Sequence, residues 1–86
     1  MVIIMLIDVR EPHEYRMGHI PNSINVPKDL LELVPEQYLS KSKRYVLYCD
    51  TGPISINLSS ELNKLGYHTT YLKGGYSKWI KENDAL

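Results

Sequence analysis

The stretch Arg44–Gly66 decides the fold and reads RYVLYCDTGPISINLSSELNKLG. Apolar, β-prone residues lead into Cys49, the only cysteine of the chain, and a turn-rich loop follows it at 50–53. Apolar residues then recur at helical spacing as far as Leu65, which predicts an amphipathic helix. A strand, a tight loop and a helix N-terminus in succession predict an anion site, because the first N–H groups of a helix have no partners within it.

The position of Cys49 in the sequence permits two interpretations of its role. Thiols at helix N-termini are enriched for reactivity as thiolates, but most lone cysteines behave as small buried apolar residues. One cysteine excludes an internal disulfide and cannot build a cysteine-based metal site. His13, His19 and His68 lack the spacing of metal ligands, so no metal site is expected. The reducing cytoplasm is the expected compartment, because disulfides are rare there.

Length and composition indicate one small globular domain over residues 1–86. The chain is 43% hydrophobic and 23% charged, which argues against disorder. Ten basic side chains balance ten acidic ones, so no global field favours binding to nucleic acid or to an acidic membrane. The apolar start, 1–7, lacks the basic region and cleavage site of a signal peptide and is too short to span a bilayer. It predicts a core strand.

Strand-type and helix-type segments alternate along the chain, which predicts an α/β sandwich with a mainly parallel sheet of about four strands. We expect strands at 2–7, 23–26, 45–48 and 69–72, and helices at 11–16, 28–33, 54–65 and 76–82. The first strand is apolar without alternation, so it should be covered on both faces. The side chains expected to face inward from the second and third helices are Leu30, Leu31, Leu33, Ile54, Ile56, Leu58, Leu62 and Leu65. Ser59 is expected to face solvent.

Polar residues gather where the first strand ends. Asp8 stands at its C-terminal end, the position at which open α/β sheets carry their sites. Arg10 and Glu14 follow at a spacing that permits an ion pair on a short helix. A solvated surface pair that contributes little is the more ordinary arrangement, and we give it more weight.

Several stretches together resemble the rhodanese domains, over almost the whole chain. The two stretches that resemble the family signatures are IDVREPHEY at 7–15 and GHIPNSINVP at 18–27. The strand that ends in Cys49, the loop from it to Ser55, and the segment LKGGYSKW at 72–79 match the rest of the family pattern. The resemblance implies a three-layer α/β sandwich, in which helices flank both faces of the sheet.

The resemblance implies a sulfurtransferase whose catalytic nucleophile is Cys49. The thiolate takes a sulfane sulfur from thiosulfate or a persulfide donor, and a thiol or cyanide acceptor then removes that sulfur from the Cys49 persulfide. No cofactor is implied, and a sulfur-relay protein is a candidate partner. The implied substrate-binding residues are Asp50, Thr51, Gly52, Pro53, Ile54 and Ser55, and the implied supporting residues are Asp8 and Arg10. Backbone N–H donors to the sulfur are expected from Asp50, Thr51, Gly52, Ile54 and Ser55.

The loop departs from the family pattern in its charge. The family often carries a basic residue where this chain has Ile54, and Pro53 has no backbone N–H to donate. Asp50, next to Cys49, opposes formation of the thiolate. We therefore expect poor use of thiosulfate, with a less charged persulfide or a partner protein preferred as the donor.

The N-terminal end also departs from the family pattern. Family members usually carry another strand and helix before the stretch 7–10, and this chain begins within that strand. We therefore expect one less protected sheet edge, and a monomer or a weak dimer. Without a second cysteine, release of the sulfur must be to an outside acceptor.

Two other functions compete with sulfur transfer. Phosphatases of the related cell-cycle type need an arginine after five intervening residues to grip the phosphate. That position is Ser55, and no arginine lies within 49–65, so a phosphatase is rejected. A non-catalytic binding or regulatory module is the stronger rival, because fold alone does not settle function. The presence of Cys49 favours the enzyme, and the uncharged Ile54 keeps the binding module open.

Overall fold

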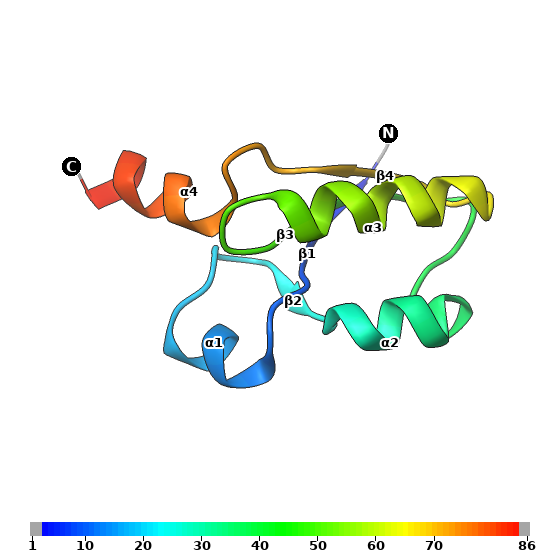
Figure 1. Ribbon diagram of the computed structural model, residues 1–86, viewed down its shortest axis with the longest axis horizontal. Coiled ribbons are helices and arrows are strands. Elements are labelled where there is room, and N and C mark those ends of the chain that lie inside the picture. The colour runs from blue at the N-terminus through cyan, green and yellow to red at the C-terminus, as the bar shows by residue number, and fades with distance from the viewer. Residues whose placement is uncertain (1–2, 85–86) are drawn as a thin grey trace.

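A computed structural model describes residues 3–84 and contains a four-stranded parallel sheet with the order β2-β1-β3-β4. The strands are β1 (Ile4–Asp8), β2 (Ile24–Asn25), β3 (Arg44–Tyr48) and β4 (His68–Tyr71). The helices are α1 (Pro12–Met17), α2 (Lys28–Leu33), α3 (Pro53–Lys64) and α4 (Gly75–Asp84), and a 3₁₀ turn, η1, lies at Pro35–Gln37. Figure 1 shows α2 beside α3, with α1 and α4 toward the other end of the molecule. The predicted α/β fold is confirmed.

One face of the sheet holds the hydrophobic core. Ile7 of β1 and Leu47 of β3 pair in register and therefore share a face. Helices α2 and α3 cover this face with three buried leucines, Leu31, Leu58 and Leu62, which belong to the same core cluster. The apolar spacing that predicted the helix after Cys49 therefore identifies the part of α3 that packs on the sheet.

The opposite face is covered near the ends at which the strands finish. Tyr48, the last residue of β3, stacks on Tyr76 of α4 with ring centroids 6.2 Å apart, and Tyr76 stacks on Trp79 at 6.0 Å. These contacts supply the third layer of the predicted sandwich. At the start of β1, Ile4 is 61% exposed, so the expectation that the first strand is covered on both faces is wrong for its first half. Val2 lies outside the described residues.

The predicted inward faces of α2 and α3 are right only in part. Leu33 is 76% exposed and Leu65 is 56% exposed, because α2 has fewer than two turns and Leu65 follows the last residue of α3. The predicted inward residues that are exposed are Leu30, Leu33, Ile54, Ile56 and Leu65. Within residues 3–84, no helix has the length and apolar character needed to cross a membrane.

Ser59 packs against β4, so the expectation that it faces solvent is wrong. It is buried, and its hydroxyl lies 2.7 Å from Thr69 Oγ1. Thr69 also donates its N–H to Asn63 Oδ1 at 2.8 Å. A polar side chain lies inward here because the strand opposite it is also polar and supplies a hydrogen-bond partner.

We expect the two ends of the leucine pattern on α3 to differ sharply in stability. Leu58→Ala should lower the free energy of unfolding by about 2–5 kcal/mol, because it leaves a cavity in the core. Leu65→Ala should change it by no more than about 0.5 kcal/mol, because this side chain is largely exposed. Urea unfolding of both variants measures the difference, and equal losses would contradict the packing described for α3.

Candidate active site

Two loops that carry predicted site residues meet at the C-terminal edge of the sheet. Asp8 and Tyr48 are the last residues of β1 and β3, and they pair with each other. The N–H of Val9 donates to Tyr48 O at 2.9 Å, which extends the pairing by one residue. Arg10 and Cys49 therefore leave neighbouring strands at the same edge of the sheet, which is where open α/β sheets bind ligands.

The thiol of Cys49 is contacted by two groups of the loop that follows it. The residue is 3% exposed. The N–H of Gly52 donates to Sγ at 3.2 Å. The Ser55 hydroxyl lies 3.5 Å from Sγ and donates to Gly52 O at 2.9 Å. Gly52 has φ +129°, a backbone conformation that side chains disfavour, and the turn it permits directs its N–H at the sulfur.

Gly52 is the one predicted backbone donor that reaches Sγ within residues 3–84. The other predicted donors are the N–H groups of Asp50, Thr51, Ile54 and Ser55. Among the described residues these four N–H groups have no hydrogen-bond acceptor. Helix α3 makes its first hydrogen bond one residue later, where the N–H of Ile56 donates to Gly52 O at 3.0 Å. The loop therefore presents free donors beside the thiol, as expected at a helix N-terminus.

The start of α4 holds the backbone of the Cys49 loop. Tyr76 N–H donates to Cys49 O at 2.8 Å, and Ser77 N–H donates to the next carbonyl at 2.9 Å. Gly75 approaches so closely that a Cβ there would lie 2.5 Å from Cys49 O. Sequence reasoning placed none of these α4 residues in the site. The signal that could have found them is the pair Gly74-Gly75, since adjacent glycines permit a close backbone approach as well as a turn.

Arg10 joins the two loops through its guanidinium. Nη2 lies 2.7 Å from Asp8 Oδ2, and Nη1 lies 3.6 Å from Asp50 Oδ1. The guanidinium also lies 4.2 Å from the ring centroid of Tyr76. Burial acts to lower the pKa of Arg10, but the hydrogen bond and charge of Asp8 raise it above its usual value. The ion pair with Glu14 that the spacing permitted is not formed, because Asp8 and Asp50 bind the guanidinium instead.

Tyr48 connects the end of β3 to the turn before β2. Its hydroxyl accepts the N–H of Ile20 at 3.1 Å and lies 2.9 Å from Ser23 Oγ. Burial raises the pKa of Tyr48 to about 12. Tyr48 is therefore neutral near pH 7 and fixes the strand that positions Cys49, rather than acting as a base.

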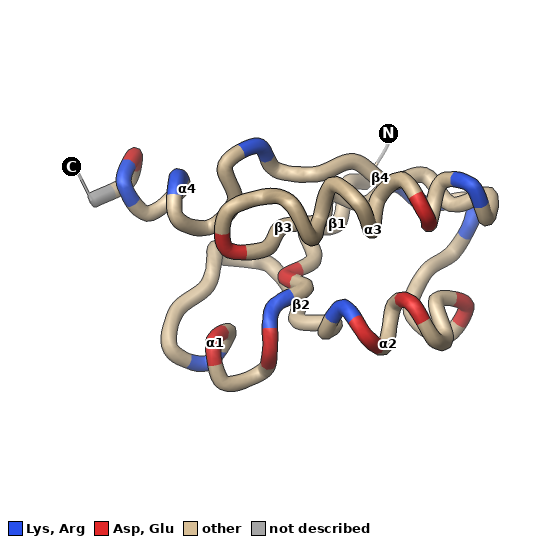
Figure 2. Tube along the Cα trace, viewed as in Figure 1, with Lys and Arg blue, Asp and Glu red and all other residues tan. Residues whose placement is uncertain are grey.

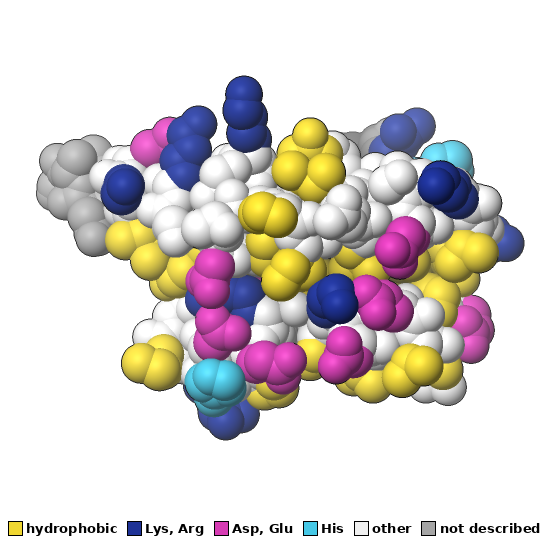
Figure 3. Space-filling model, viewed as in Figure 1, with side chains coloured by type: hydrophobic (Ala, Val, Ile, Leu, Met, Phe, Trp, Pro, Cys, Tyr) yellow, Lys and Arg dark blue, Asp and Glu magenta, His cyan; other side chains and the backbone are white. Residues whose placement is uncertain are grey.

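A cavity of about 470 Å³ opens at Cys49. Its walls come from the segment after β1, from α1, from the start of α2, and from the Cys49 loop with the start of α3. Four of the predicted substrate-binding residues line it, namely Asp50, Thr51, Pro53 and Ile54. Figure 3 shows Asp and Glu side chains gathered over α1 and α2 on the face in view. Residues 3–84 contain no cluster of three or more side chains suited to a metal ion.

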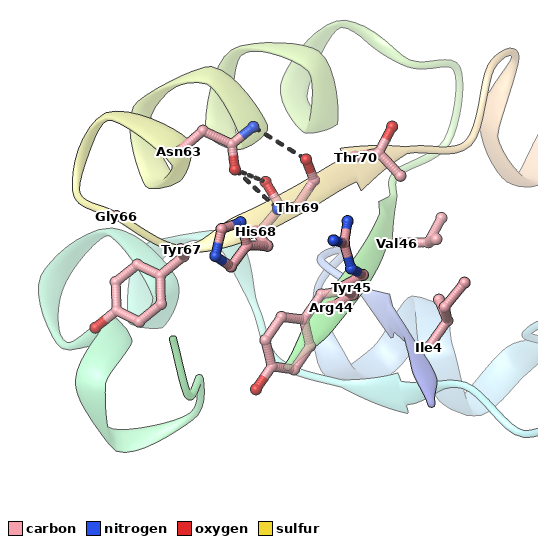
Figure 4. Close-up of a pocket in the computed structure, with 10 residues that line it drawn as sticks. All are labelled: Ile4, Arg44, Tyr45, Val46, Asn63, Gly66, Tyr67, His68, Thr69 and Thr70. Atoms are coloured by element: carbon pink, nitrogen blue, oxygen red, sulfur yellow. Dashed lines mark hydrogen bonds between the residues drawn. The ribbon is translucent and has the colours of Figure 1, made fainter. Parts of the chain in front are cut away.

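A second hollow of about 430 Å³ lies at the opposite end of the sheet, where the strands begin. Figure 4 shows Ile4, Arg44 and His68 among the residues that line it. Two of the polar side chains there are engaged in the fold, since Asn63 binds Thr69 of β4 and the hydroxyl of Tyr45 accepts the N–H of Ser40 at 2.7 Å. None of the predicted site residues lines this hollow. The cavity at Cys49 is therefore the stronger candidate site.

We expect Gly75→Ala to damage the site and the fold together. Gly75 has φ +61°, and a Cβ would lie 2.7 Å from Asp50 O as well as against Cys49 O. The change should lower the free energy of unfolding by about 1–3 kcal/mol through this overlap, and by about 1–2 kcal/mol more through the left-handed backbone. It should also change the rate at which iodoacetamide alkylates Cys49.

Gly66→Ala is the matched control. Gly66 also has a positive φ, of +102°, but a Cβ there would meet only the flexible side chain of Lys41 at 3.4 Å. The free energy of unfolding of this variant should fall by about 1–2 kcal/mol, and the alkylation rate of Cys49 should stay unchanged. Equal behaviour of the two variants would contradict the role of Gly75 in holding the loop.

Comparison with known proteins agrees with the fold. The family model described as Rhodanese-like domain matches residues 2–82. The chain is 35% identical over 79 residues to the putative sulfurtransferase YtwF of Bacillus subtilis (strain 168), covering 90% of this chain and 74% of that protein. It is 32% identical over 90 residues to the thiosulfate:glutathione sulfurtransferase of Saccharomyces cerevisiae, covering 90% of this chain and 65% of that protein.

A solved structure gives the same result. The crystal structure of a rhodanese-related protein from Thermoplasma volcanium superposes with a TM-score of 0.84 at 35% sequence identity, covering 92% of this chain and 78% of that one. The range that the family model matches, 2–82, includes β1, β3, the Cys49 loop and most of α4. The chain belongs to the rhodanese-like domain family, and the two relatives described above carry the names of sulfurtransferases.

Proposed function

We propose that this chain is a rhodanese-type sulfurtransferase that carries a sulfane sulfur on Cys49. The observation that supports this most directly is the setting of the only thiol, which meets Gly52 N–H and the Ser55 hydroxyl beside an open cavity. Backbone and hydroxyl donors beside a sulfur stabilise an anion there, and both a thiolate and a persulfide are anions. The family supports sulfur transfer as the class of reaction.

The loading step is a displacement at sulfur. The Cys49 thiolate attacks the outer sulfur of the donor, a bond forms between Sγ and that sulfur, and the sulfur–sulfur bond of the donor breaks. The leaving group takes the electron pair, as sulfite from thiosulfate or as a thiolate from a persulfide. The thiolate supplies one electron pair to the new bond and the leaving group takes one pair away, so the step requires no external oxidant or reductant.

The loop then holds the persulfide. Gly52 N–H continues to donate to Sγ, and the free N–H groups of Thr51, Ile54 and Ser55 are available to the added outer sulfur. The Ser55 hydroxyl now donates to Gly52 O, and it turns to donate to sulfur once the sulfur is anionic. Asp50 and Thr51 line the cavity from which the donor arrives.

The unloading step uses an acceptor from outside the chain. A thiolate or cyanide attacks the outer sulfur, the bond from that sulfur to Sγ breaks, and Cys49 recovers its electron pair as a thiolate. With cyanide the product is thiocyanate, and with a thiol it is a persulfide of that thiol. The chain has no second cysteine to take the sulfur, so a small thiol or a sulfur-relay protein is the proposed partner.

Arg10 and Asp8 have proposed supporting roles rather than a part in the chemistry. Arg10 binds Asp8 and Asp50, so it fixes the loop and is not free to bind an anionic donor. Pro53 supplies no N–H, and Ile54, at 46% exposure, supplies no charge. These features support a persulfide donor over thiosulfate, although the yeast relative is named for thiosulfate.

We expect incubation with a small persulfide to increase the mass of the intact protein by one sulfur atom, reversibly with cyanide. Cys49→Ser should abolish this gain and leave the urea unfolding curve nearly unchanged, because serine is close to cysteine in size. Mass spectrometry of both proteins measures the gain. Turnover by the serine variant above the uncatalysed rate would refute the mechanism, and no gain in the parent protein would favour the binding module.

We expect Ser55→Ala to slow loading of Cys49 by about 10- to 100-fold, since a hydrogen bond to a charged group contributes about 1.5–3 kcal/mol. Ser60→Ala is the matched control, because Ser60 lies exposed on the same helix. Stopped reactions analysed by intact mass give both rates. Unchanged loading in Ser55→Ala, with the fold intact, would contradict the role of this hydroxyl.

A further inference from the structure

We propose that the cavity at Cys49 selects its donor by charge, and that the donor it fits is a persulfide on a lysine- or arginine-rich segment of a partner protein. This inference rests on the proposed function, because it names the substrate class of the same site. The inference concerns those residues of the cavity wall that do not contact the sulfur and that have no role in the transfer steps.

Carboxylates outnumber cations in the wall of the cavity. The four acidic residues that line it are Glu11, Glu14, Asp29 and Asp50, and the two basic residues are Arg10 and Lys28. They come from three separate parts of the chain, namely α1 with the residue before it, the start of α2, and the Cys49 loop. An approaching donor therefore meets negative charge on more than one side.

Both cations of the wall are already paired. Arg10 Nη2 lies 2.7 Å from Asp8 Oδ2, and its side chain is almost fully buried. Lys28 Nζ lies 3.1 Å from Glu32 Oε1. Within residues 3–84, Glu11, Glu14 and Asp29 have no ion-pair partner of their own. The uncompensated charge at the cavity is therefore negative.

The overall balance of charge conceals this local field. The whole chain has no net charge, but Figure 2 shows most of the acidic positions on the α1 and α2 side of the molecule. Lys73, Lys78 and Lys81 lie on and before α4, away from the cavity wall. The Debye length is about 10 Å at 0.1 M salt, so carboxylates around one cavity act together on a ligand that enters it.

The cavity also has an apolar side, formed by Val9, Pro53 and Ile54. Lysine and arginine have long methylene stems that pack on such surfaces while their charges stay in water. A basic segment therefore fits both parts of the wall, whereas a small dianion such as thiosulfate meets repulsion and gains no apolar contact. Charge complementarity of this kind acts mainly on the rate of encounter.

The transfer from such a segment is balanced. The Cys49 thiolate attacks the outer sulfur of the partner's cysteine persulfide, and the bond between the two partner sulfurs breaks. The partner leaves as a thiolate with the electron pair, and Cys49 gains the persulfide together with the proton that the outer sulfur carried. The released thiolate can take a proton from water and then dissociate.

Short peptides of equal length, each with one cysteine persulfide, test the inference. The cysteine is flanked by lysines, by glutamines or by glutamates, and single-turnover loading of Cys49 is followed by intact mass. At low salt the lysine peptide should load Cys49 at least about tenfold faster than the glutamate peptide, with the glutamine peptide between them. The difference should shrink as salt is added.

A triple variant and its control locate the effect. Glu11→Gln, Glu14→Gln and Asp29→Asn together should bring the lysine and glutamate peptides close to equal rates. Glutamine keeps the hydrogen bonds by which Glu11 and Glu14 cap α1, and Asp50 is left in place because it binds Arg10. Glu36→Gln, Glu61→Gln and Glu82→Gln make the same change in net charge at exposed positions outside the cavity, and should preserve the preference.

The outcomes separate this inference from the proposed function. Loading at equal rates by all three peptides, or fastest loading by the glutamate peptide, overturns the charge selection and leaves sulfur transfer standing. An equal loss of preference in the control triple variant overturns the assignment to the cavity. If no persulfide loads Cys49 at any salt concentration, the proposed function falls, and the inference that depends on it falls as well.

Discussion

The structure at Cys49 depends on one buried cation. The guanidinium of Arg10 binds the carboxylate at the end of β1, the carbonyl of Gly18 at 2.7 Å and the carboxylate of Asp50 in the loop after β3. Its positive charge compensates the carboxylate of Asp8, which is fully buried. Removing the guanidinium would leave that carboxylate without its cation and would free the loop, so the fold and the site share one electrostatic requirement.

Around this cation, most of the contacts that shape the site are made by backbone. The loop is held by N–H groups of α4 on one side and contacts the thiol with Gly52 N–H on the other. Backbone donors do not need a particular side chain, and this leaves the cavity wall free to vary in charge. The acidic wall of this chain, to which Glu14 and Asp29 contribute, is therefore compatible with the common fold and with the proposed role of Cys49.

The sequence predicted the order of the elements because the strands are short runs of apolar, β-branched or aromatic residues and several helices have a clear start or stop, as with Pro53 and Gly66. It also placed Cys49 and Asp8 at one edge of the sheet. Some side chains lie differently from the prediction because their partners come from other segments of the chain. Ser59 is buried because Thr69 lies opposite it. Arg10 pairs with Asp50 and not with Glu14, because Asp50 is forty residues away in sequence but its Oδ1 lies 3.6 Å from Arg10 Nη1. Periodicity carries no information about such partners.

The hydrogen bond from Tyr76 N–H to Cys49 O has a consequence for synthesis of the chain. A ribosome makes Cys49 well before it makes Gly75–Ser77, so the nascent loop has its helix but lacks the segment that fixes its carbonyls. Until α4 docks, the carbonyls of Cys49 and Asp50 lack these two hydrogen bonds, so the loop that carries the thiol has fewer constraints. The cysteine therefore acquires its final environment only when the last helix arrives, and fraying of that helix in the finished protein would return it to the earlier state.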